Sequence, residues 1–437
     1  MSGTALIWVA IALTLAVLSL RRPVWAVALY FQTFFAAPHL WWWGDEIPRL
    51  RYSLWSGCLL LIVVARPYLR DKLPWSAART AAVLFVLNAT FVHLLLAPNR
   101  EISFDQYLEV VKFVLLFFLL DRAIRDRRDL TIVLVALAVG AGYIGYEATI
   151  NHRGTFTGSR LEGIGAPAAT TANGLASMML LVTPLAGSLV LERKVWMKAV
   201  AAFTAPLILN VVVMCNSRGA FLGLIAGGVT LLGLSSGGLR KRVVRTLLVG
   251  SAVLYLLLGD PRILERFTTT FAGSDERDNS ASSRIVFWTA GLRLLSDHPL
   301  GAGGGAFKFV YAPRYLREVG SDEEARSLHN GYLTTATDWG VQGLVLNVVF
   351  LFAPLLSCVR ASRARAKAGL LNEGLLGLTL AAAAVGFFIT CIFGSYLTNE
   401  WAFWIAALML KYSEMGAAGQ AATTQELAPV GHAGIAA

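Results

Sequence analysis

The sequence predicts an all-α polytopic integral membrane protein. Of its 437 residues, 56% are hydrophobic and only 15% are charged. Soluble proteins average roughly 45–50% apolar and about 25% charged residues. Apolar runs recur along almost the whole chain. Most of them approach the ~20 residues that a helix needs to cross a ~30 Å hydrocarbon core.

The apolar runs define the expected membrane helices. They cover residues 5–20, 24–43, 54–65, 80–97, 107–120, 130–148, 170–191, 197–215, 219–234, 243–258, 331–358, 375–393 and 396–410. The runs at 5–20 and 54–65 are short, and a pair of runs could be re-entrant or interfacial. We therefore expect about twelve spans.

The net charge of +11 reports the membrane topology. More than half of the 38 basic residues lie in alternate loops, at 21–22, 66–79, 122–128, 193–198, 240–245, 360–367 and Lys411. Cytoplasmic loops carry such an excess of Lys and Arg. The remaining loops should then face outward. This topology accounts for the basic balance, so we expect membrane lipids around the helices and no nucleic-acid partner.

One polar segment interrupts the apolar chain, and it sets the expected organisation. We expect a transmembrane bundle over residues 1–259, a non-cytoplasmic segment over 260–330, further transmembrane helices over 331–412 and a disordered tail over 413–437. The tail is rich in Ala, Gly and Thr and lacks periodicity. Long polar segments in compact proteins are usually functional or disordered.

The pattern within the polar segment predicts a helix over residues 283–295. Ser283 can cap it. Apolar residues at helical spacing are Phe287, Trp288, Leu292 and Leu295. Pro299 prevents continuation beyond Asp297. We expect this helix to lie along the membrane surface or under a lid.

Other patterns predict scaffold. Gly219, Gly223 and Gly227 have the spacing that lets membrane helices approach closely. The run Trp41-Trp42-Trp43 fits an interfacial aromatic belt. The cysteines lie in or at the end of apolar runs without Cys-x-x-Cys spacing, which predicts packing roles for Cys58, Cys215, Cys358 and Cys391.

The acidic residues predict no metal site. A metal-dependent transferase usually holds its cation with closely spaced carboxylates, but no Asp-x-Asp lies in the outward loops. Asp45-Glu46 and the run 322–324 fit solvated loops better. The glycine-rich run 301–305 could cradle a phosphate, but it lacks Gly-Lys-Ser/Thr and follows no predicted strand, which favours a turn. We expect no cofactor.

Three arginines of the outward loops are candidate anion ligands. Arg218 lies between two apolar runs, Arg284 opens the predicted surface helix, and Arg160 lies in a glycine-rich loop. An arginine near a membrane helix is costly unless it is compensated or functional. Its planar donor fork and permanent charge suit an anionic group. Pairing with lipid headgroups or carboxylates is the alternative interpretation.

His329 is the candidate general base. It lies where the polar segment re-enters the membrane, close to a predicted helix N-terminus. An imidazole titrates near physiological pH and can accept a proton from a hydroxyl. The alternative is an ordinary surface histidine, which is our interpretation of His39, His93, His152 and His432; His298 fits a structural turn.

Four pieces in order resemble the superfamily of bacterial O-antigen ligases and O-antigen polymerases. They are Asn216-Ser217-Arg218-Gly219-Ala220, Ser283-Arg284 followed by Trp288, Asp297-His298-Pro299-Leu300-Gly301-Ala302-Gly303, and Ser327-Leu328-His329-Asn330 followed by Gly340-x-x-Gly343. Each piece alone is weak, but the ordered set is fairly specific. With the polytopic layout, the resemblance covers nearly the whole chain.

The resemblance implies a GT-C-type glycosyltransferase of the bacterial inner membrane whose active site faces the periplasm. Such an enzyme moves a glycan from undecaprenyl diphosphate to an acceptor hydroxyl, without nucleotide sugar or metal. In the ligase branch the acceptor is a sugar of lipid A core, and the product is lipopolysaccharide.

The resemblance also assigns residue roles. Arg218 and Arg284 match the family's functional arginines, which would stabilise the diphosphate, with Arg160 as a third. His329 matches the essential histidine and would be the base. The neighbours expected to contact substrate are Ser217, Ser283 and Asn330.

Alternative functions remain open from sequence. An O-antigen polymerase or a protein O-oligosaccharyltransferase would use the same donor and similar motifs. A lipid-linked glycan flippase would also be polytopic and basic, and Lys112, inside an apolar run, is the residue that such a transporter could use. The single outer segment of moderate size favours the ligase.

Overall fold

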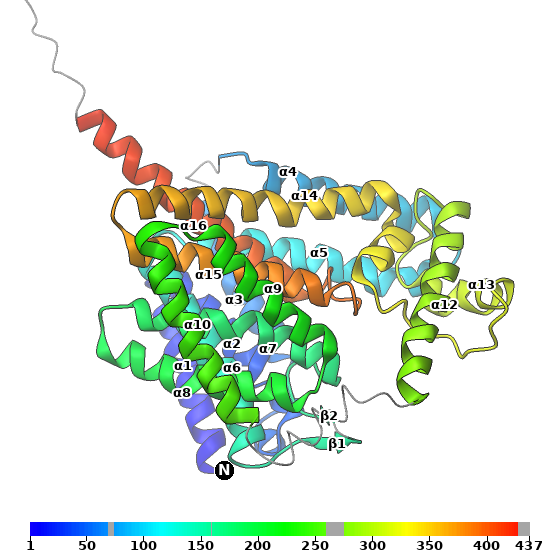
Figure 1. The fold of residues 1–437 in the computed structure, drawn as a ribbon, viewed down its shortest axis with the longest axis horizontal. Helices are drawn as coiled ribbons and strands as arrows, with labels where there is room; N and C mark the ends of the chain where they lie inside the picture. Colours follow the sequence, from blue (N-terminus) through cyan, green and yellow to red (C-terminus); the bar gives the residue numbers. More distant parts are fainter. Residues whose placement is uncertain (69–73, 159, 259–274, 427–437) are drawn as a thin grey trace, which may run out of the picture.

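The computed structural model describes residues 1–68, 74–158, 160–258 and 275–426. The described chain is predominantly helical, and helices make up nearly all of its regular secondary structure (Figure 1). The exception is a short antiparallel hairpin of β1 (Thr155–Thr157) and β2 (Arg160–Glu162), in which Phe156 pairs with Leu161. The all-α prediction therefore missed this hairpin, which is only three residues long on each side.

The helices follow one another with short connections. In chain order they are α1 (Gly3–Ser19), α2 (Val24–Phe35), α3 (Tyr52–Tyr68), α4 (Ala77–Phe91), α5 (Arg100–Ala123), α6 (Arg127–Thr149), α7 (Ala172–Gly187), α8 (Val195–Met214), α9 (Arg218–Leu234), α10 (Gly237–Leu258), α12 (Asp275–Asp297), α13 (Ala312–Glu318), α14 (Gly331–Lys367), α15 (Leu371–Thr390) and α16 (Glu400–Glu426). Single turns are η1 (Pro38–Leu40), η2 (Gly44–Glu46), η3 (Val92–Leu96), η4 (Ser188–Leu191) and η5 (Phe307–Tyr311).

Six helical segments of the described chain are long and apolar enough to cross a membrane. They are Ala77–Leu96, Arg127–Thr149, Ala172–Leu191, Val195–Met214, Gly331–Lys367 and Leu371–Thr390. Four shorter apolar helices accompany them: Gly3–Ser19, Val24–Leu40, Tyr52–Ala65 and Arg218–Leu234. These helices support a polytopic membrane protein. Fewer qualify than the expected twelve, because α1, α3 and α9 have only 17 residues each, and because α5, α10 and α16 are long enough but are not among the six apolar segments.

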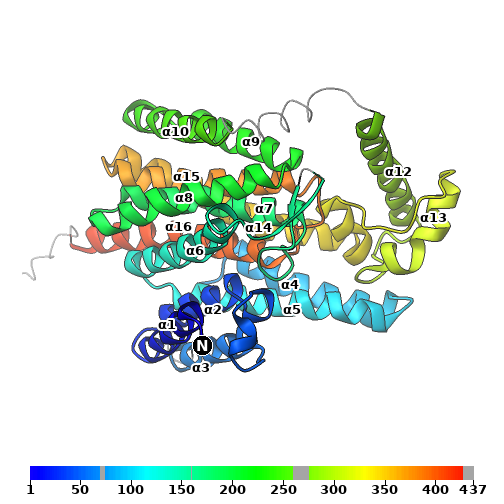
Figure 2. The same cartoon turned by 90° about the horizontal axis from the view of Figure 1, so that it is seen from below.

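The long helices run side by side, and the polar segment covers one end of them. In Figures 1 and 2, α12 and α13 stand at this end, and α12 runs across the axes of the long helices. We call it the outer end, because α9 and α14 begin here whereas the basic residues Arg365 and Lys367 lie at the opposite end of α14. Helix α12 therefore lies crosswise to the long helices at their outer end, and its placement along a membrane surface stays a prediction.

The glycines of α9 pack against α15 as predicted. A Cβ on Gly223 would lie 2.6 Å from the carbonyl oxygen of Gly386, and a Cβ on Gly386 would lie 2.8 Å from that of Gly223. A Cβ on Gly227 would lie 3.2 Å from the carbonyl oxygen of Ala382. Small residues thus let the two backbones touch. This contact fixes the position of Arg218, the first residue of α9.

Helix α14 is broken at Gly340, and the glycine-rich turn docks on the break. Gly340 has φ 80° and ψ 169°, which no helix tolerates. The amides of Ala302 and Gly303 donate to the carbonyls of Thr337 and Asp338 at 2.9 and 3.0 Å. The Gly304 amide donates to Ser103 Oγ at 3.1 Å. These amides are occupied, so the run 301–305 is a structural turn, as predicted, instead of a phosphate cradle.

The tryptophan run does not form an interfacial belt. Trp43 and Trp41 are buried, at 1% and 7% exposure, and only Trp42 is exposed. The Trp43 indole donates to the Tyr143 hydroxyl at 2.8 Å, which attaches the α2–α3 connection to α6. The prediction was wrong because this connection folds back over the bundle, where the indoles find buried partners.

The C-terminal helix continues further than the sequence suggested. The last apolar run ends at residue 410, whereas α16 reaches Glu426, inside the expected disordered tail. Residues 427–437 of that tail, like 260–274 of the polar segment, lie outside the described residues. The three cysteines at 215, 358 and 391 are buried and free, in agreement with packing roles, and Cys58 is free and exposed.

Candidate active site

The candidate residues lie on elements that meet at the outer end. Arg160 belongs to β2, Arg218 begins α9, and Arg284 lies on α12. His329 lies two residues before the start of α14. Two residues of this region, Asn216 and His329, have left-handed backbones with φ of 46° and 50°. Non-glycine residues seldom adopt this conformation, and it often marks functional sites.

Arg218 is presented by a tight turn between two helices. Helix α8 ends at Met214 and α9 begins at Arg218. Ser217 holds the cap position, but its hydroxyl donates to Asn173 Oδ1 at 2.9 Å and does not cap the helix. The first amides of α9 therefore lack a side-chain cap, and such a helix N-terminus favours an anion. The Arg218 side chain is exposed beside it.

Asn173 connects Arg160 to the α9 turn. Arg160 Nη2 donates to Asn173 Oδ1 at 2.5 Å, and Arg160 Nε donates to the Cys215 carbonyl at 3.4 Å. One amide oxygen thus receives bonds from both Arg160 and Ser217. Asn173 lies in the first turn of α7, whose cap is Thr171. Sequence reasoning missed Asn173; its signal was a polar residue at the start of an apolar run.

Arg284 is close enough to Arg160 and Arg218 for their positive charges to lower its pKa. Its pKa is lowered, first because burial disfavours the cation and then because Arg160 and Arg218 add positive charge, while Tyr396 opposes the effect. Its guanidinium carbon lies 5.9 Å from the centre of the Phe393 ring. Over the described part of the chain, no carboxylate forms an ion pair with Arg160, Arg218 or Arg284. The cluster can therefore hold an external anion.

Helix α12 starts earlier than predicted, and this changes the role of Ser283. The helix begins at Asp275, so Ser283 lies inside it and does not cap it. Its hydroxyl donates to Glu323 Oε2 at 2.5 Å instead. The buried face is also shifted, because Leu294 is buried whereas Leu292 is 55% exposed. The end at Asp297 agrees with the prediction.

The packing of α12 fixes the segment that carries His329. Phe287, Ala290 and Leu294 pack with Leu328, which is 2% exposed. The Trp288 indole N–H donates to the Leu328 carbonyl at 3.0 Å. Because Leu328 precedes His329, these contacts set the position of the imidazole. The helix that carries Arg284 therefore also positions His329.

His329 is a half-buried imidazole whose neutral form is favoured. Its pKa is lowered from 6.5, mainly by burial and then by the positive charges of Arg284, Arg326 and Lys308. Nδ1 lies 3.4 Å from Ser327 Oγ, and Nε2 has no hydrogen bond among the residues that the structure describes. A neutral imidazole can accept a proton.

Asn330 caps α14. Its Oδ1 accepts from the amides of Tyr332 and Leu333 at 3.0 and 3.1 Å. The residue that directly follows Asn330 is Gly331, and its N–H donates to the Cys391 carbonyl at 2.7 Å. The expected substrate contact by Asn330 thus competes with a structural role, and the cap attaches the His329 segment to the α15–α16 connection.

A cavity of about 240 Å³ lies beside Ser327 and Leu328, the two residues before His329, and we call it the polar cavity after the polar side chains in its lining. Its polar lining comprises Gln106, Glu109, Lys308, Ser327, Thr334, Asp338, Ser395, Thr398 and Asn399. Ser327 is also the hydrogen-bonding neighbour of His329. Trp339 and Phe307 add aromatic walls. Hydroxyl-binding side chains beside an aromatic surface suit a sugar ring.

Tyr396 is a second residue that sequence reasoning missed. It lies in the α15–α16 connection, close enough to Arg160 and Arg284 for their charges to act on its hydroxyl. Burial raises its pKa, while the two arginines oppose this shift. A tyrosine in a short loop carries no sequence signal of its own.

Within the described residues, no group of three or more His, Cys, Asp or Glu side chains could hold a metal ion.

One comparison with known proteins bears on this site. Residues 203–348 match the model of a family described as O-antigen ligase. The matched segment includes Arg218, Arg284 and His329, whereas Arg160 lies outside it. No curated protein matches the chain.

Proposed function

Because residues 203–348 belong to the O-antigen ligase superfamily, whose members are membrane ligases or polymerases of the glycosyltransferase type, we propose that this protein is an O-antigen ligase. It transfers an O-antigen glycan from undecaprenyl diphosphate to a sugar hydroxyl of lipid A core, on the periplasmic face of the inner membrane. The convergence of Arg160, Arg218 and Arg284 carries this proposal.

The arginines suit a diphosphate leaving group. Negative charge develops on the diphosphate as its bond to the sugar breaks. A preorganised donor at such a position typically contributes about 2.7–4 kcal/mol to transition-state stabilisation. Arg218 and Arg284 take this role, together with the open N-terminus of α9, and Arg160 supports them. None of the three arginines has to break an ion pair with a carboxylate before it binds the diphosphate.

His329 supplies the base. The acceptor hydroxyl oxygen attacks the anomeric carbon, its proton passes to the imidazole, and the electron pair of the broken carbon–oxygen bond stays on the diphosphate. The lowered pKa of His329 keeps the imidazole ready to accept that proton. The polar cavity beside Ser327 is where the acceptor sugar binds.

The charge distribution supports a periplasmic site. The basic loops, including the 122–128 connection and the end of α14, lie away from the elements that carry the arginine cluster. Since basic loops stay in the cytoplasm, the outer end faces the periplasm. Lys112 is exposed on α5 and does not extend the arginine cluster into the bundle, which makes a flippase the weaker explanation.

The experiment compares two variants with matched controls. We expect His329→Ala and Arg284→Ala to abolish transfer by purified protein, using a defined undecaprenyl-diphosphate-linked glycan and lipid A core. His39→Ala and Arg293→Ala should retain it, because His39 is exposed and because Arg293, on the same α12, is exposed and bonds to the Glu318 carbonyl. Wild-type transfer by the His329→Ala protein would contradict the assignment of the base.

Deletion of the gene distinguishes the acceptor. Free lipid A core together with polymer retained on undecaprenyl diphosphate identifies a ligase. Single-unit capping identifies a polymerase, and loss of glycan from secreted protein identifies a protein O-oligosaccharyltransferase. Donor retained on the cytoplasmic face identifies a flippase.

A further inference from the structure

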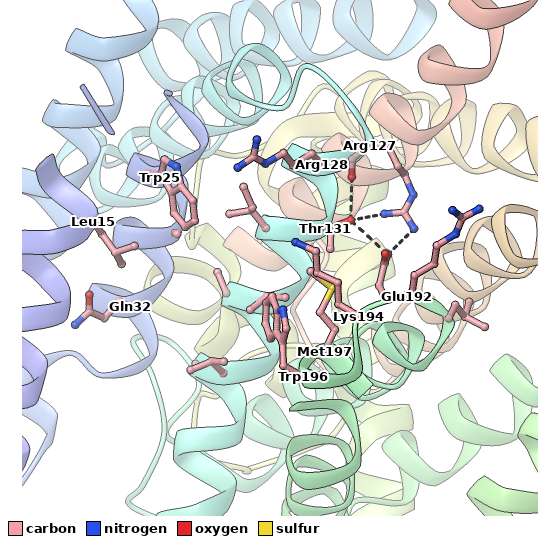
Figure 3. A pocket seen from close by; sticks show the side chains of 18 of the residues that line it. Leu15, Trp25, Gln32, Arg127, Arg128, Thr131, Glu192, Lys194, Trp196 and Met197 are labelled. Atoms are coloured by element: carbon pink, nitrogen blue, oxygen red, sulfur yellow. Dashed lines mark hydrogen bonds and ion pairs between the residues drawn. The ribbon is translucent and has the colours of Figure 1, made fainter. Parts of the chain in front are cut away.

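A second, larger cavity of about 1130 Å³ lies apart from the candidate active site. It is a groove between α1 and α2 on one side and α6 and α8 on the other. Figure 3 shows Leu15 and Trp25 on one wall and Trp196 and Met197 on the opposite wall. None of the arginines of the cluster, nor His329, lines it. The proposed transfer reaction therefore does not account for this groove.

The middle of the groove is apolar and open. Three aliphatic lining residues remain exposed: Ile7 at 62%, Ile11 at 45% and Val139 at 51%. They lie on α1 and α6, which are apolar helices of membrane-spanning character. At this depth only hydrocarbon is available to cover such surface. The shape and lining of the groove thus suit acyl chains.

One end of the groove is strongly basic. Its charged lining residues are Arg127, Arg128, Arg193, Lys194, Arg242, Glu192 and Glu373. Arg127 forms ion pairs with both acidic residues. Its Nη2 lies 2.6 Å from Glu192 Oε1, a pair that Figure 3 shows, and its Nε lies 3.0 Å from Glu373 Oε1. The remaining charge on this end is therefore positive.

Three of the basic side chains are available to a ligand. Arg128, Arg193 and Lys194 are exposed. In the stretches of chain that the structure describes, none of them has a hydrogen bond or an ion pair with a carboxylate. Arg242, in contrast, bonds to Asn372. An anionic headgroup would meet three cations here without displacing an internal partner.

The helix ends add to this potential. Helices α6, α8 and α15 all begin at the basic end of the groove, at Arg127, Val195 and Leu371. Neither α8 nor α15 has a side-chain cap. Free amides at a helix N-terminus favour a phosphate. Trp25 and Trp196 border the same region, at the level where indole rings meet headgroups.

We propose that this groove binds one anionic phospholipid of the cytoplasmic leaflet. The phosphate lies at Arg128, Arg193 and Lys194, and the acyl chains lie along Ile11 and Val139. The lipid fills the groove between α1 and α2 on one side and α6 and α8 on the other. The site differs from that of the donor, whose diphosphate is assigned to the arginine cluster at the outer end.

The test measures lipid retention by the purified full-length protein. After delipidation in detergent, native mass spectrometry is performed with added dioleoyl phosphatidylglycerol or dioleoyl phosphatidylcholine. We expect one tightly retained phosphatidylglycerol and at least tenfold weaker binding of phosphatidylcholine. Equal retention of the two lipids would overturn the proposal, since charge would then play no part.

Two sets of variants locate the site. The triple variant Arg128→Gln, Arg193→Gln, Lys194→Gln should weaken phosphatidylglycerol binding at least tenfold. The matched triple Lys198→Gln, Arg240→Gln, Lys241→Gln removes the same charge from exposed positions that do not line the groove, and it should bind as the wild type does. Equal losses in both triples would show binding to the whole basic surface and would contradict the proposal.

A further variant tests the apolar part. Val139→Trp fills the groove and leaves every basic residue in place. It should reduce phosphatidylglycerol retention, whereas Val345→Trp, at an exposed position on α14 outside the groove, should not. Unchanged retention by Val139→Trp would mean that the acyl chains lie elsewhere, and the assignment of the groove would be wrong.

Discussion

The indole N–H of Trp288 donates to the carbonyl oxygen of Leu328 at 3.0 Å, so the helix that carries Arg284 also holds the backbone next to His329. The bond joins α12 to a segment whose next residue has a left-handed backbone, with φ of 50°. The proposed anion ligand and the proposed base are thereby positioned by one element.

Trp288→Phe tests this coupling. Phenylalanine keeps an aromatic ring in the packing but cannot donate the hydrogen bond, which is typically worth about 1 kcal/mol. We expect kcat to fall about fivefold to a hundredfold, because displacement of a catalytic group by ~1 Å can cost about a hundredfold in rate. The KM for the donor should stay unchanged. A selective rise in the donor KM would show that Trp288 serves the donor site instead.

The pH dependence follows from the lowered pKa of His329. Because this pKa lies below 6.5, kcat/KM should be constant above pH 6.5 and fall only at lower pH, as the imidazole is protonated. Arg326→Gln removes one of the charges that lower the pKa, so the acidic limb should move to higher pH. Arg317→Gln, an exposed change elsewhere in the segment, should leave it in place.

The lowered pKa of His329 also makes the free energy of unfolding depend on pH. The unfolded chain binds the His329 proton more readily than the folded chain does, between the folded pKa and 6.5. The free energy of unfolding should therefore be highest above pH 6.5 and decrease as the pH falls through that window. Thermal unfolding of wild type and His329→Gln at several pH values measures the difference.

Asn173→Ala should weaken donor binding. The substitution removes the amide oxygen that accepts hydrogen bonds from both Arg160 and Ser217. A hydrogen bond to a charged group contributes about 1.5–3 kcal/mol. We expect the donor KM to rise about tenfold to a hundredfold, with a smaller effect on the acceptor KM. If Asn173→Ala changed only protein yield, with normal kinetics, Asn173 would be a purely structural residue.

Glu109→Gln tests the polar cavity as the acceptor site. Glu109 lines the cavity, and the isosteric change removes its charge with little change in volume. We expect a severalfold rise in the KM for lipid A core and an unchanged donor KM. The control is Glu101→Gln on the same α5, which is exposed and does not line the cavity. Equal effects of the two changes would argue against an acceptor site here.

Gly223→Val tests the α9–α15 contact. The added Cβ would meet the Gly386 carbonyl at 2.6 Å, and overpacking of this kind typically costs about 1–3 kcal/mol. We expect a lower melting temperature and loss of transfer, since the start of α9 presents Arg218. Gly233→Ala on the same helix meets nothing within 4 Å and should melt as the wild type does.

Features carried by local pattern could be predicted from the sequence. The close approach at Gly223 followed from the spacing of small residues, and the end of α12 followed from Pro299. Arg218 and His329 are candidates because they stand at the ends of apolar runs, and Arg284 because it opens the predicted surface helix; their roles stay predictions. In each case the signal lies within a few neighbouring residues.

Features that depend on distant parts of the chain could not be predicted. Asn173 is part of the site only because Arg160 of β2 and Ser217 before α9 both bond to it. Tyr396 is part of the site because the α15–α16 connection lies near Arg160 and Arg284. Ser283 can cap a helix that begins after it, whereas the helix begins at Asp275. The burial of Trp41 and Trp43 likewise depends on a fold-back that no local periodicity encodes.

The order of the site residues along the chain has a consequence for biosynthesis. Arg160 is synthesised early, whereas His329 and Tyr396 emerge from the ribosome long after it. The anchor of the His329 segment, Gly331 N–H on the Cys391 carbonyl, forms only after α15 has been inserted. The proposed site is therefore complete only in the last steps of membrane insertion, and a nascent chain that lacks α15 cannot carry out the proposed transfer.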